Sequence, residues 1–329
     1  MWNLDFASAL PCRCVDAAEI AEWTDGDEAF IRDKVGIESR RFLLPDESPL
    51  DLAERAVEAA LSEASLSAGE LGWLIFVTQN PDYRLPQSSA LLCDRIGAPC
   101  SIAAFDLSLG CSGWVYALTL ANAFVTQADL GSGLIVTCDP YSRAMARDDK
   151  STTTVFGDAA AVTVMRPGGP VSIGKAVYGT DGAGGMGLAA VAGGARHPLI
   201  SIDSETGGDG QISRDCAIRM DGRAILDFMQ TRIPKCVEDC LRANELDREE
   251  VDLFVFHQAS RYMLALLTRR MRLDPEKVPI EMAQTGNTVS STIPIALERL
   301  RQRGELGGNV VVCGFGVGLS WAATVIKFG

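Results

Sequence analysis

The chain reads LSAGELGWLIF at residues 66–76 and LDREEVDLFVF at residues 246–256, and the two stretches align without a gap. Each stretch follows a segment with the apolar spacing of a helix and runs into an apolar sequence typical of a buried strand. A second pair occurs in the same order, because residues 105–111 and residues 281–287 each lead into a further helical stretch. Two matches in the same order indicate that the chain contains a duplication.

Helices alternate with buried strands in both halves of the sequence. Ser48 as an N-cap and Asp51 in a capping box predict where one helix begins, and residues 224–243 carry the matching helix of the second half. Further apolar strands are expected at residues 133–138, 159–165, 309–312 and 321–328. Such alternation is typical of the α/β class. We therefore expect two similar halves, 1–168 and 169–329, packed as one pseudo-symmetric body.

The composition excludes several classes of protein. Of the 329 residues, 47% are hydrophobic and 22% are charged, which is typical of a soluble globular protein. The net charge of −13 argues against a nucleic-acid partner, and no apolar run is long enough for a membrane span. The ten cysteines form no C-x-x-C pair and only two histidines occur, so we expect no metal site. With no recognisable secretory signal, we expect a cytoplasmic protein.

A glycine-rich stretch lies between the two halves, from Gly179 to Gly210. It contains the spacing of the dinucleotide fingerprint at residues 182–187, with Asp203 downstream. The segment that should form the following helix, residues 188–192, is cut short by two glycines, whereas a crossover helix needs about 10–12 residues. We therefore interpret this stretch as a surface loop and not as a nucleotide site.

Three polar residues stand where predicted strands end. Cys111 lies between a strand and a helix, where the N–H groups of a helix N-terminus favour a thiolate, although a buried and inert cysteine has the same appearance. His257 ends an apolar strand and could be a packing residue. Asn287 occupies the corner of the second half that matches Cys111 in the first, and a turn asparagine is its alternative. Glycines at residues 314–318 offer backbone N–H groups to an oxyanion, or form a tight hairpin.

Together these residues resemble the β-ketoacyl-ACP synthase III branch of the thiolase superfamily. The likeness extends over nearly the whole chain and rests on Phe30 to Arg41, Phe105-Asp106 to Ser112-Gly113, Phe156-Gly157-Asp158, His257-Gln258-Ala259, Gly286-Asn287-Thr288, and Gly314-Phe315-Gly316 to Trp321. The resemblance implies a thiolase-like duplicated five-layer αβαβα fold. It also implies a homodimer with a Cys-His-Asn active site at the bottom of a tunnel.

The resemblance assigns a chemical role to each of these residues. Cys111 takes an acyl group from a CoA or carrier-protein thioester, and the backbone N–H groups of Cys111 and Val317 hold the oxyanion. His257 and Asn287 bind the carbonyl of a malonyl thioester, so that loss of CO2 leaves a stabilised enolate for a Claisen condensation. The substrates are thioesters of coenzyme A or of carrier-bound phosphopantetheine, and no bound cofactor is implied. The implied setting is fatty-acid-like or polyketide-type metabolism.

Two further groups of residues follow from the resemblance. The acyl pocket is assigned to Leu85, Phe156, Phe315 and Leu319, and the binding of CoA or the carrier to Phe30, Lys34, Lys150, Arg223, Ser260 and Arg261. Leu85 replaces a phenylalanine that is frequent in the family, which suggests a roomier pocket. Phe30, Lys34 and Tyr262 also depart from the family pattern, so the donor stays open between CoA and a carrier. Arg269, Arg270 and Arg272 offer a basic rim for an acidic carrier, or a solvated helix face.

Four alternatives remain beside this interpretation. An acyltransferase of the same fold would pass the acyl group to an alcohol or amine without condensation. A plant-type polyketide synthase also uses Cys, His and Asn, but such chains are usually longer. A degradative thiolase would need a second cysteine near Cys313, and a non-catalytic partner subunit typically lacks the nucleophile. The presence of Cys111, His257 and Asn287 together favours condensation.

Overall fold

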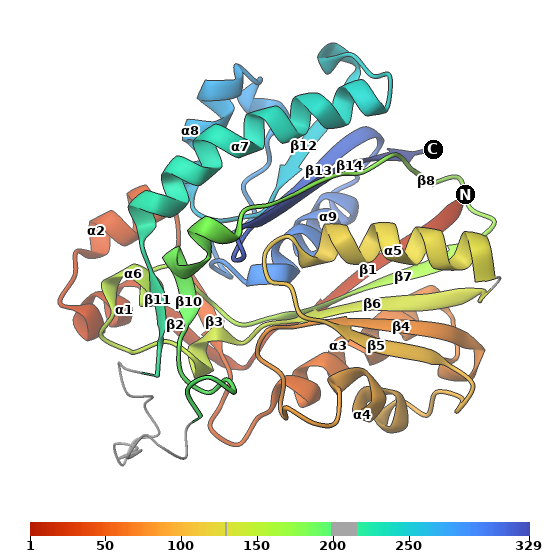
Figure 1. Cartoon of the computed structure of the whole chain (residues 1–329), viewed down its shortest axis with the longest axis horizontal. Coiled ribbons are helices and arrows are strands. Elements are labelled where there is room, and N and C mark those ends of the chain that lie inside the picture. The colour runs from red at the N-terminus through yellow and green to blue at the C-terminus, as the bar shows by residue number, and fades with distance from the viewer. Residues whose placement is uncertain (129, 199–215) are drawn as a thin grey trace.

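Figure 1 presents the computed structural model, which describes residues 1–128, 130–198 and 216–329. Its first sheet has five strands in the order β1-β7-β6-β4-β5. β4, β5 and β6 run parallel to one another, whereas β7 is antiparallel to both β6 and β1. The strands are β1 (Trp2–Ala9), β4 (Leu71–Val77), β5 (Ala103–Leu107), β6 (Ser132–Cys138) and β7 (Ala160–Pro167).

The second sheet repeats this mixed pattern. β12 pairs in parallel with β13, β13 is antiparallel to β14, and β14 pairs along its other edge with β8 and β9. The strands are β8 (Ser172–Ile173), β9 (Val177–Thr180), β12 (Leu253–Phe256), β13 (Gly308–Gly316) and β14 (Ser320–Phe328). The chain therefore leaves the first sheet after Pro167 and enters the second at Ser172. The predicted division at residue 168 is compatible with this crossover and stays a prediction.

Helices form three layers around the two sheets (Figure 1). α5 and α9 lie between the sheets and contact strands of both, α3 and α4 cover the outer face of the first sheet, and α7 packs on the second beside α8. The helices are α3 (Pro49–Ala64), α4 (Ser88–Arg95), α5 (Gly113–Ala128), α7 (Gly222–Ala243), α8 (Arg261–Met271) and α9 (Thr292–Gln302). The predicted five-layer αβαβα fold is confirmed. No helix among the described residues is long and apolar enough to cross a bilayer.

The two aligned stretches of sequence occupy equivalent places. Each forms one 3-10 turn, Ala68–Glu70 or Arg248–Glu250, and continues into a strand, β4 in the interior of the first sheet or β12 at the edge of the second. A capping box holds both turns, with Ser67 in the first half and Asp247 in the second. The local sequence thus builds the same turn-to-strand unit twice, as the duplication predicts.

The second predicted match is realised in its helices, because residues 105–111 lead into α5 and residues 281–287 lead into α9, but the two segments differ before the helix. Residues 105–107 belong to the edge strand β5, but residues 281–287 form turns and no strand. The reason lies in their hydrogen bonds: the Glu281 N–H donates to the Gln258 side chain at 2.8 Å, and the Ala283 carbonyl accepts from the N–H groups of Glu38 and Ser39. Because other segments use these backbone groups, no sheet edge forms there.

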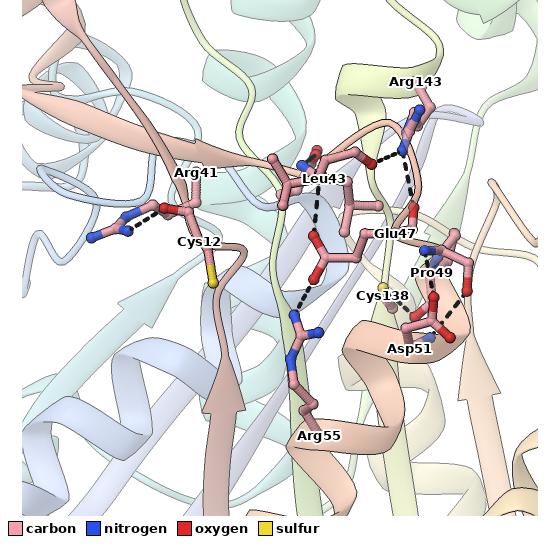
Figure 2. A network of polar contacts seen from close by, with 12 residues as sticks. Cys12, Arg41, Leu43, Glu47, Pro49, Asp51, Arg55, Cys138 and Arg143 are labelled. Carbon is pink, nitrogen blue, oxygen red and sulfur yellow. Dashed lines mark hydrogen bonds and ion pairs between the residues drawn. The ribbon is translucent and has the colours of Figure 1, made fainter.

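The predicted start of α3 is confirmed and tied to its surroundings. The Ser48 hydroxyl accepts from the Asp51 N–H at 3.1 Å, and the Asp51 carboxylate accepts from the Ser48 N–H at 2.8 Å. Figure 2 shows the network around this cap, in which Arg143 donates to the carbonyls of Leu44 and Glu47. Glu47 also pairs with Arg55 of the helix. These contacts fix the helix against the loop that follows β6.

Smaller elements gather at one end of the sheets, on the left of Figure 1. They are β2 (Arg13–Asp16), α1 (Ala17–Thr24), α2 (Glu28–Phe30), a π-helix (Ile31–Val35), β3 (Ser39–Phe42), α6 (Lys150–Thr153), β10 (Leu188–Ala190) and β11 (Ile218–Met220). The parallel strands β4, β5 and β6 have their carboxyl ends at this side. Functional groups of α/β proteins collect at such ends.

The glycine-rich stretch differs from the predicted surface loop. Residues 182–187 form a 3-10 turn, and β10 follows directly and pairs with β11, so the helix of a nucleotide site is missing from this part of the described chain. Asp181 and Leu319 exchange two backbone hydrogen bonds, at 2.8 and 3.0 Å. The segment around Asp181 is therefore hydrogen-bonded to the loop between β13 and β14. Asp203, the acidic residue of the fingerprint, lies outside the described residues.

Candidate active site

Cys111, His257 and Asn287 lie at the ends of secondary-structure elements and are all buried. Cys111 comes directly before α5, and His257 directly after β12. The His257 Nε2 lies 3.3 Å from the Asn287 Nδ2. The segment Phe315-Gly316 lies between this pair and the thiol. A Cβ atom built on Gly316 would come within 2.8 Å of the Cys111 Sγ. The ring of Phe315 lies 5.6 Å from the imidazole ring of His257. The structure thus brings the three predicted residues to one site.

Burial determines the protonation state of Cys111. Loss of solvent, together with the nearby Asp139 carboxylate, raises the pKa of the thiol to about 12. Hydrogen bonds from the backbone of Cys111 and Val317 act in the opposite direction and are too weak to reverse the shift. The resting thiol is therefore protonated at neutral pH. The sequence alone left a thiolate at a helix start and a buried thiol as alternatives, because the start of α5 is visible in the sequence and the burial is not.

This raised pKa has a measurable consequence. Because the thiolate is the nucleophile, the rate constant for alkylation of Cys111 by iodoacetamide should rise about tenfold per pH unit from about pH 6 to pH 9. Peptide mass spectrometry would follow the residue, with Cys111→Ala as the blank. An ordinary thiol levels off near its pKa of about 8.5. A plateau in that region would contradict the shift.

Hydrogen bonds fix the tautomer of His257. Its Nδ1 lies 2.7 Å from the Thr292 hydroxyl, which itself donates to the Val289 carbonyl at 3.1 Å. A hydroxyl has only one hydrogen, so in this arrangement the Nδ1 carries the proton and the Nε2 lone pair accepts from the Asn287 Nδ2. Burial lowers the pKa of His257 to about 3, which keeps the ring neutral. The Nε2 is therefore a proton acceptor in the resting site.

The orientation of the Asn287 amide is also determined. Its Oδ1 accepts from the Val289 N–H at 2.9 Å, which turns the Nδ2 toward His257. Behind it, the Asn287 backbone forms an isolated bridge with Phe156, through hydrogen bonds to Val155 and Gly157 that are both 3.0 Å long. The amide hydrogens are thus presented at a rigid position.

Several residues near Cys111 that were not predicted from the sequence fix the backbone around the thiol. The Ser320 hydroxyl donates to the Val317 carbonyl at 2.9 Å and lies 2.7 Å from the Ser112 hydroxyl, which ties the glycine-rich hairpin to the residue after Cys111. The buried Asp139 carboxylate accepts from the Gln79 N–H at 2.6 Å and from Ser290. Its place directly after strand β6 is the one signal that could have identified it.

A pocket of about 260 Å³ lies beside the nucleophile. A Cβ atom on Gly110, the residue before Cys111, would come within 2.8 Å of Val317 and 2.6 Å of Gln79, which both line this pocket. The complete lining is Gln79, Asn80, Ser108, Tyr141, Ala144, Leu188, Ala189, Ala190, Ile218 and Val317. Cys111, His257 and Asn287 are not among these lining residues, and the link to the site is Val317, whose backbone N–H hydrogen-bonds with the Cys111 sulfur.

None of the four side chains predicted for the acyl pocket lines this space. Phe156 lies behind it and packs edge-on against Tyr141, with ring centroids 5.0 Å apart. The Phe315 ring packs against the His257 ring, and the backbone of Leu319 forms hydrogen bonds with the backbone of Asp181. Leu85 is 86% exposed on this chain. The residues that do line the pocket come from distant parts of the sequence, which no local pattern connects.

A second pocket, of about 400 Å³, brings together two of the residues predicted to bind the donor. It is lined by Thr24, Asp25, Gly26, Asp27, Phe30, Ile31, Lys150 and Thr154. Phe30 is half-exposed there, and the Lys150 ammonium donates to the Asp25 carbonyl. The structure therefore places an aromatic ring and a cation at one opening.

The other predicted donor-binding residues lie outside this pocket. Lys34 belongs to the π-helix, and Arg223 to the first turn of α7. Ser260 caps α8 by accepting from the Met263 N–H at 3.2 Å, and Arg261 packs against Gly36. In the described ranges, no group of three or more His, Cys, Asp or Glu side chains could hold a metal ion.

Comparisons with known proteins agree with this geometry. The family model described as 3-Oxoacyl-[acyl-carrier-protein (ACP)] synthase III matches residues 105–182, which include Cys111. The model for the C-terminal part of the same family matches residues 241–328, which include His257 and Asn287.

Relatives match the chain over almost its full length. The β-ketoacyl-[acyl-carrier-protein] synthase III of Clostridioides difficile (strain 630) is 32% identical over 331 residues, covering 99% of this chain and 97% of the relative. A crystal structure of a 3-oxoacyl-(acyl-carrier-protein) synthase III has a TM-score of 0.93 at 36% identity, covering 98% of each chain. The priming β-ketosynthase of the R1128 polyketide pathway has a TM-score of 0.89 at 26% identity, covering 100% of this chain and 96% of that one. The chain therefore belongs to the 3-oxoacyl-[acyl-carrier-protein] synthase III family of the thiolase superfamily, and it is a condensing enzyme of the acyltransferase type.

Proposed function

We propose that the reaction begins with transfer of an acyl group to Cys111. The observation that carries this proposal is the position of the sulfur, beside the backbone N–H groups of Cys111 and Val317 and before α5. Attack on a thioester carbonyl forms a new C–S bond and moves charge to the carbonyl oxygen, where the two N–H groups stabilise it. The CoA or carrier thiol then leaves with the proton that Cys111 gave up.

Condensation with a malonyl thioester is the second step of the proposal. The thioester carbonyl accepts hydrogen bonds from His257 and Asn287, and the bond to the carboxylate carbon breaks to release CO2. The enolate carbon then attacks the acyl group on Cys111, which forms the new C–C bond and breaks the C–S bond. Cys111 leaves as a thiolate and takes up a proton from water to return to the resting thiol. The product is a β-ketoacyl thioester. The setting is fatty-acid-like or polyketide-type metabolism.

His257 has to exchange one tautomer for the other during this cycle. Its unprotonated Nε2 exchanges the hydrogen bond from Asn287 for the thiol proton during acylation and passes that proton to the leaving thiol. To bind the malonyl carbonyl, the same Nε2 must carry a hydrogen. A hydroxyl both donates and accepts, so rotation of the Thr292 hydroxyl toward the Nδ1 permits the second tautomer.

Thr292→Val is expected to slow decarboxylation of the malonyl thioester about tenfold while acylation of Cys111 changes less than about threefold. Valine has no hydroxyl that could donate to the Nδ1. The Nδ1 therefore stays protonated and donates to the Val289 carbonyl, and the Nε2 stays unprotonated. Thr292→Ser retains the hydroxyl and serves as the control. Release of CO2 and acylation would be timed separately, and equal losses in both would contradict the tautomer exchange.

The donor site is proposed at the pocket that contains Phe30 and Lys150. An aromatic ring and an ammonium group at one opening suit the base and phosphates of coenzyme A or the phosphate of a carrier arm. Arg269 and Arg270 lie in the last turn of α8, about 13 Å along the helix from Arg261 at 1.5 Å per residue. These two residues of the predicted basic rim therefore lie at the opposite end of α8 from Arg261.

Intact-protein mass spectrometry tests the whole scheme. The protein would be incubated with a panel of acyl-CoA and acyl-carrier thioesters, and a mass gain on Cys111 is expected. Loss of the adduct with formation of a β-keto product after malonyl thioester is added would support condensation. Transfer to an amine or alcohol would select the acyltransferase instead. An absence of adducts from every donor would overturn the proposal and favour a non-catalytic subunit.

We further propose a homodimer that forms through β5 and α5. β5 is an edge strand, and Phe105 on it contacts Phe124 of α5 with ring centroids 5.7 Å apart. Leu120 and Phe124 on α5, and Tyr178 next to this helix, are large apolar side chains that are partly exposed on the single chain. An open strand edge beside apolar side chains is suited to pairing with a second copy.

Phe124→Arg is expected to convert the dimer to a monomer at micromolar concentration, because a cation replaces an aromatic contact of the proposed interface. Sedimentation equilibrium would measure the mass in solution. Ile280→Arg is the matched control, since Ile280 is 39% exposed, against 36% for Phe124, and lies away from β5 and α5 in the sequence. A wild-type monomer, or a dimer that survives Phe124→Arg, would contradict this interface.

A further inference from the structure

We propose that the acyl group taken up by Cys111 is short and carries a neutral hydroxyl or carbonyl oxygen, which hydrogen-bonds with Gln79 in the pocket beside Gly110. This inference rests on the proposed acylation of Cys111 and adds the chemical class of the acyl group. Four of the ten lining residues have polar side chains, Gln79, Asn80, Ser108 and Tyr141. A pocket meant for a plain hydrocarbon chain would be lined by apolar groups.

The Gln79 carboxamide lies next to Gly110, the residue before Cys111. Its Oε1 would be 2.6 Å from a Cβ atom on Gly110, which precedes Cys111 in the chain. The Gln79 backbone is fixed as well, since its N–H donates to the buried Asp139 carboxylate at 2.6 Å. A group bound to Cys111 that enters this pocket therefore passes the end of the Gln79 side chain.

The orientation of the amide leaves its donors free for a ligand. In the structure the Tyr141 hydroxyl donates to the Gln79 Oε1 at 3.3 Å, and the Nε2 with its two hydrogens forms the other end of the amide. Within residues 1–128, 130–198 and 216–329, no hydrogen bond uses these two hydrogens or the Ser108 hydroxyl. The pocket therefore presents N–H and O–H donors that only water or a ligand can satisfy.

These donors discriminate between acyl groups. A hydrocarbon chain that fills the pocket removes water from them and returns no hydrogen bond, which is costly for polar groups. A hydroxyl or keto oxygen replaces the lost water. A site that hydrogen-bonds its substrate selects against an analogue without the polar group much more strongly than an apolar pocket selects for an extra carbon.

The charges around the pocket select a neutral oxygen and not a carboxylate. None of the ten lining residues is charged, so a carboxylate would find no cation among the described residues of this lining. The buried Asp139 carboxylate lies close enough to raise the pKa of both Tyr141 and Cys111, and it would repel a second anion. Ala144, Leu188 and Ile218 supply an apolar wall for the carbon atoms of the chain.

Matched pantetheine thioesters test this inference. The rate constant for acylation of Cys111 would be measured by intact-protein mass spectrometry for butyryl-pantetheine, for each enantiomer of 3-hydroxybutyryl-pantetheine and for succinyl-pantetheine. One 3-hydroxybutyryl enantiomer is expected to react about tenfold faster than butyryl, the size of one net hydrogen bond. Succinyl is expected to be the slowest. Pantetheine is common to CoA and carrier proteins, so the result is independent of the donor.

Two variants assign the preference to Gln79. Gln79→Leu is expected to reduce the ratio of hydroxybutyryl to butyryl rate constants to about one, because it removes the amide donors at similar volume. Leu188→Met alters the apolar wall and is expected to keep the wild-type ratio. Equal rates for butyryl and hydroxybutyryl in the wild type, or a faster succinyl thioester, would overturn the inference and leave acylation intact. No adduct on Cys111 from any thioester would overturn the proposed function and the inference with it.

Discussion

Cys111→Ala is expected to abolish acylation and to lower the rate of condensation by at least about 10⁴-fold, since loss of a covalent nucleophile removes the acyl-enzyme route altogether. The fold should persist, because alanine occupies the same backbone and leaves only a small void at a buried position. The measurement is the mass of the protein after incubation with an acyl thioester, followed by a product assay with a malonyl thioester.

Cys313→Ala is the matched control for this variant. Cys313 is also buried with a pKa raised well above the usual range, but it lies on β13 beside Cys236 and Cys240 of α7. We expect its replacement to leave the acylation rate within about threefold of the wild type, because no reacting atom lies there. Loss of activity in Cys313→Ala with full acylation in Cys111→Ala would instead support a thiolase-like use of the second cysteine.

Much of the architecture could be predicted from the sequence, because it depends on local patterns. The matched stretches at residues 66–76 and 246–256 each contain the capping residues of a 3-10 turn and the apolar run of a strand, so one repeat predicted both sheets. The start of α3 was equally readable from Ser48 and Asp51. The three polar residues at element ends were identified for the same reason. The resemblance to the β-ketoacyl-ACP synthase III branch depends on the order of these residues along the chain and not on their contacts.

What the sequence could not predict depends on contacts between distant residues. The pocket beside Gly110 takes Gln79, Tyr141, Leu188 and Ile218 from four separate segments, and none of them stands in a motif. The predicted side chain Leu85 illustrates the same limit, since it is 86% exposed on this chain and its position in the sequence does not reveal what it contacts. The sign of the pKa shift of Cys111 also depends on burial and on Asp139, which only the folded chain reveals.

Asn287→Ala is expected to leave acylation of Cys111 within about threefold of the wild type and to slow decarboxylative condensation about 10²–10³-fold. The amide hydrogens of Asn287 face His257 and the proposed site of the malonyl carbonyl, so their loss removes stabilisation only where enolate charge develops. Acylation uses the backbone N–H groups of Cys111 and Val317 instead. A burst of acyl-enzyme without release of CO2 is therefore the expected pattern.

Asn287→Asp separates this chemical role from a structural one. The Asn287 Oδ1 accepts from the Val289 N–H at 2.9 Å, so alanine could also disturb the loop that carries Thr292. Aspartate keeps that acceptor at the same size and replaces the amide donor by a carboxylate oxygen, whose negative charge also opposes the enolate. If Asn287→Asp condensed at the wild-type rate, the amide would not act on the malonyl carbonyl. If it were as slow as Asn287→Ala while both variants still acylated, the two halves of the reaction would be assigned to two separate sets of donors within one site.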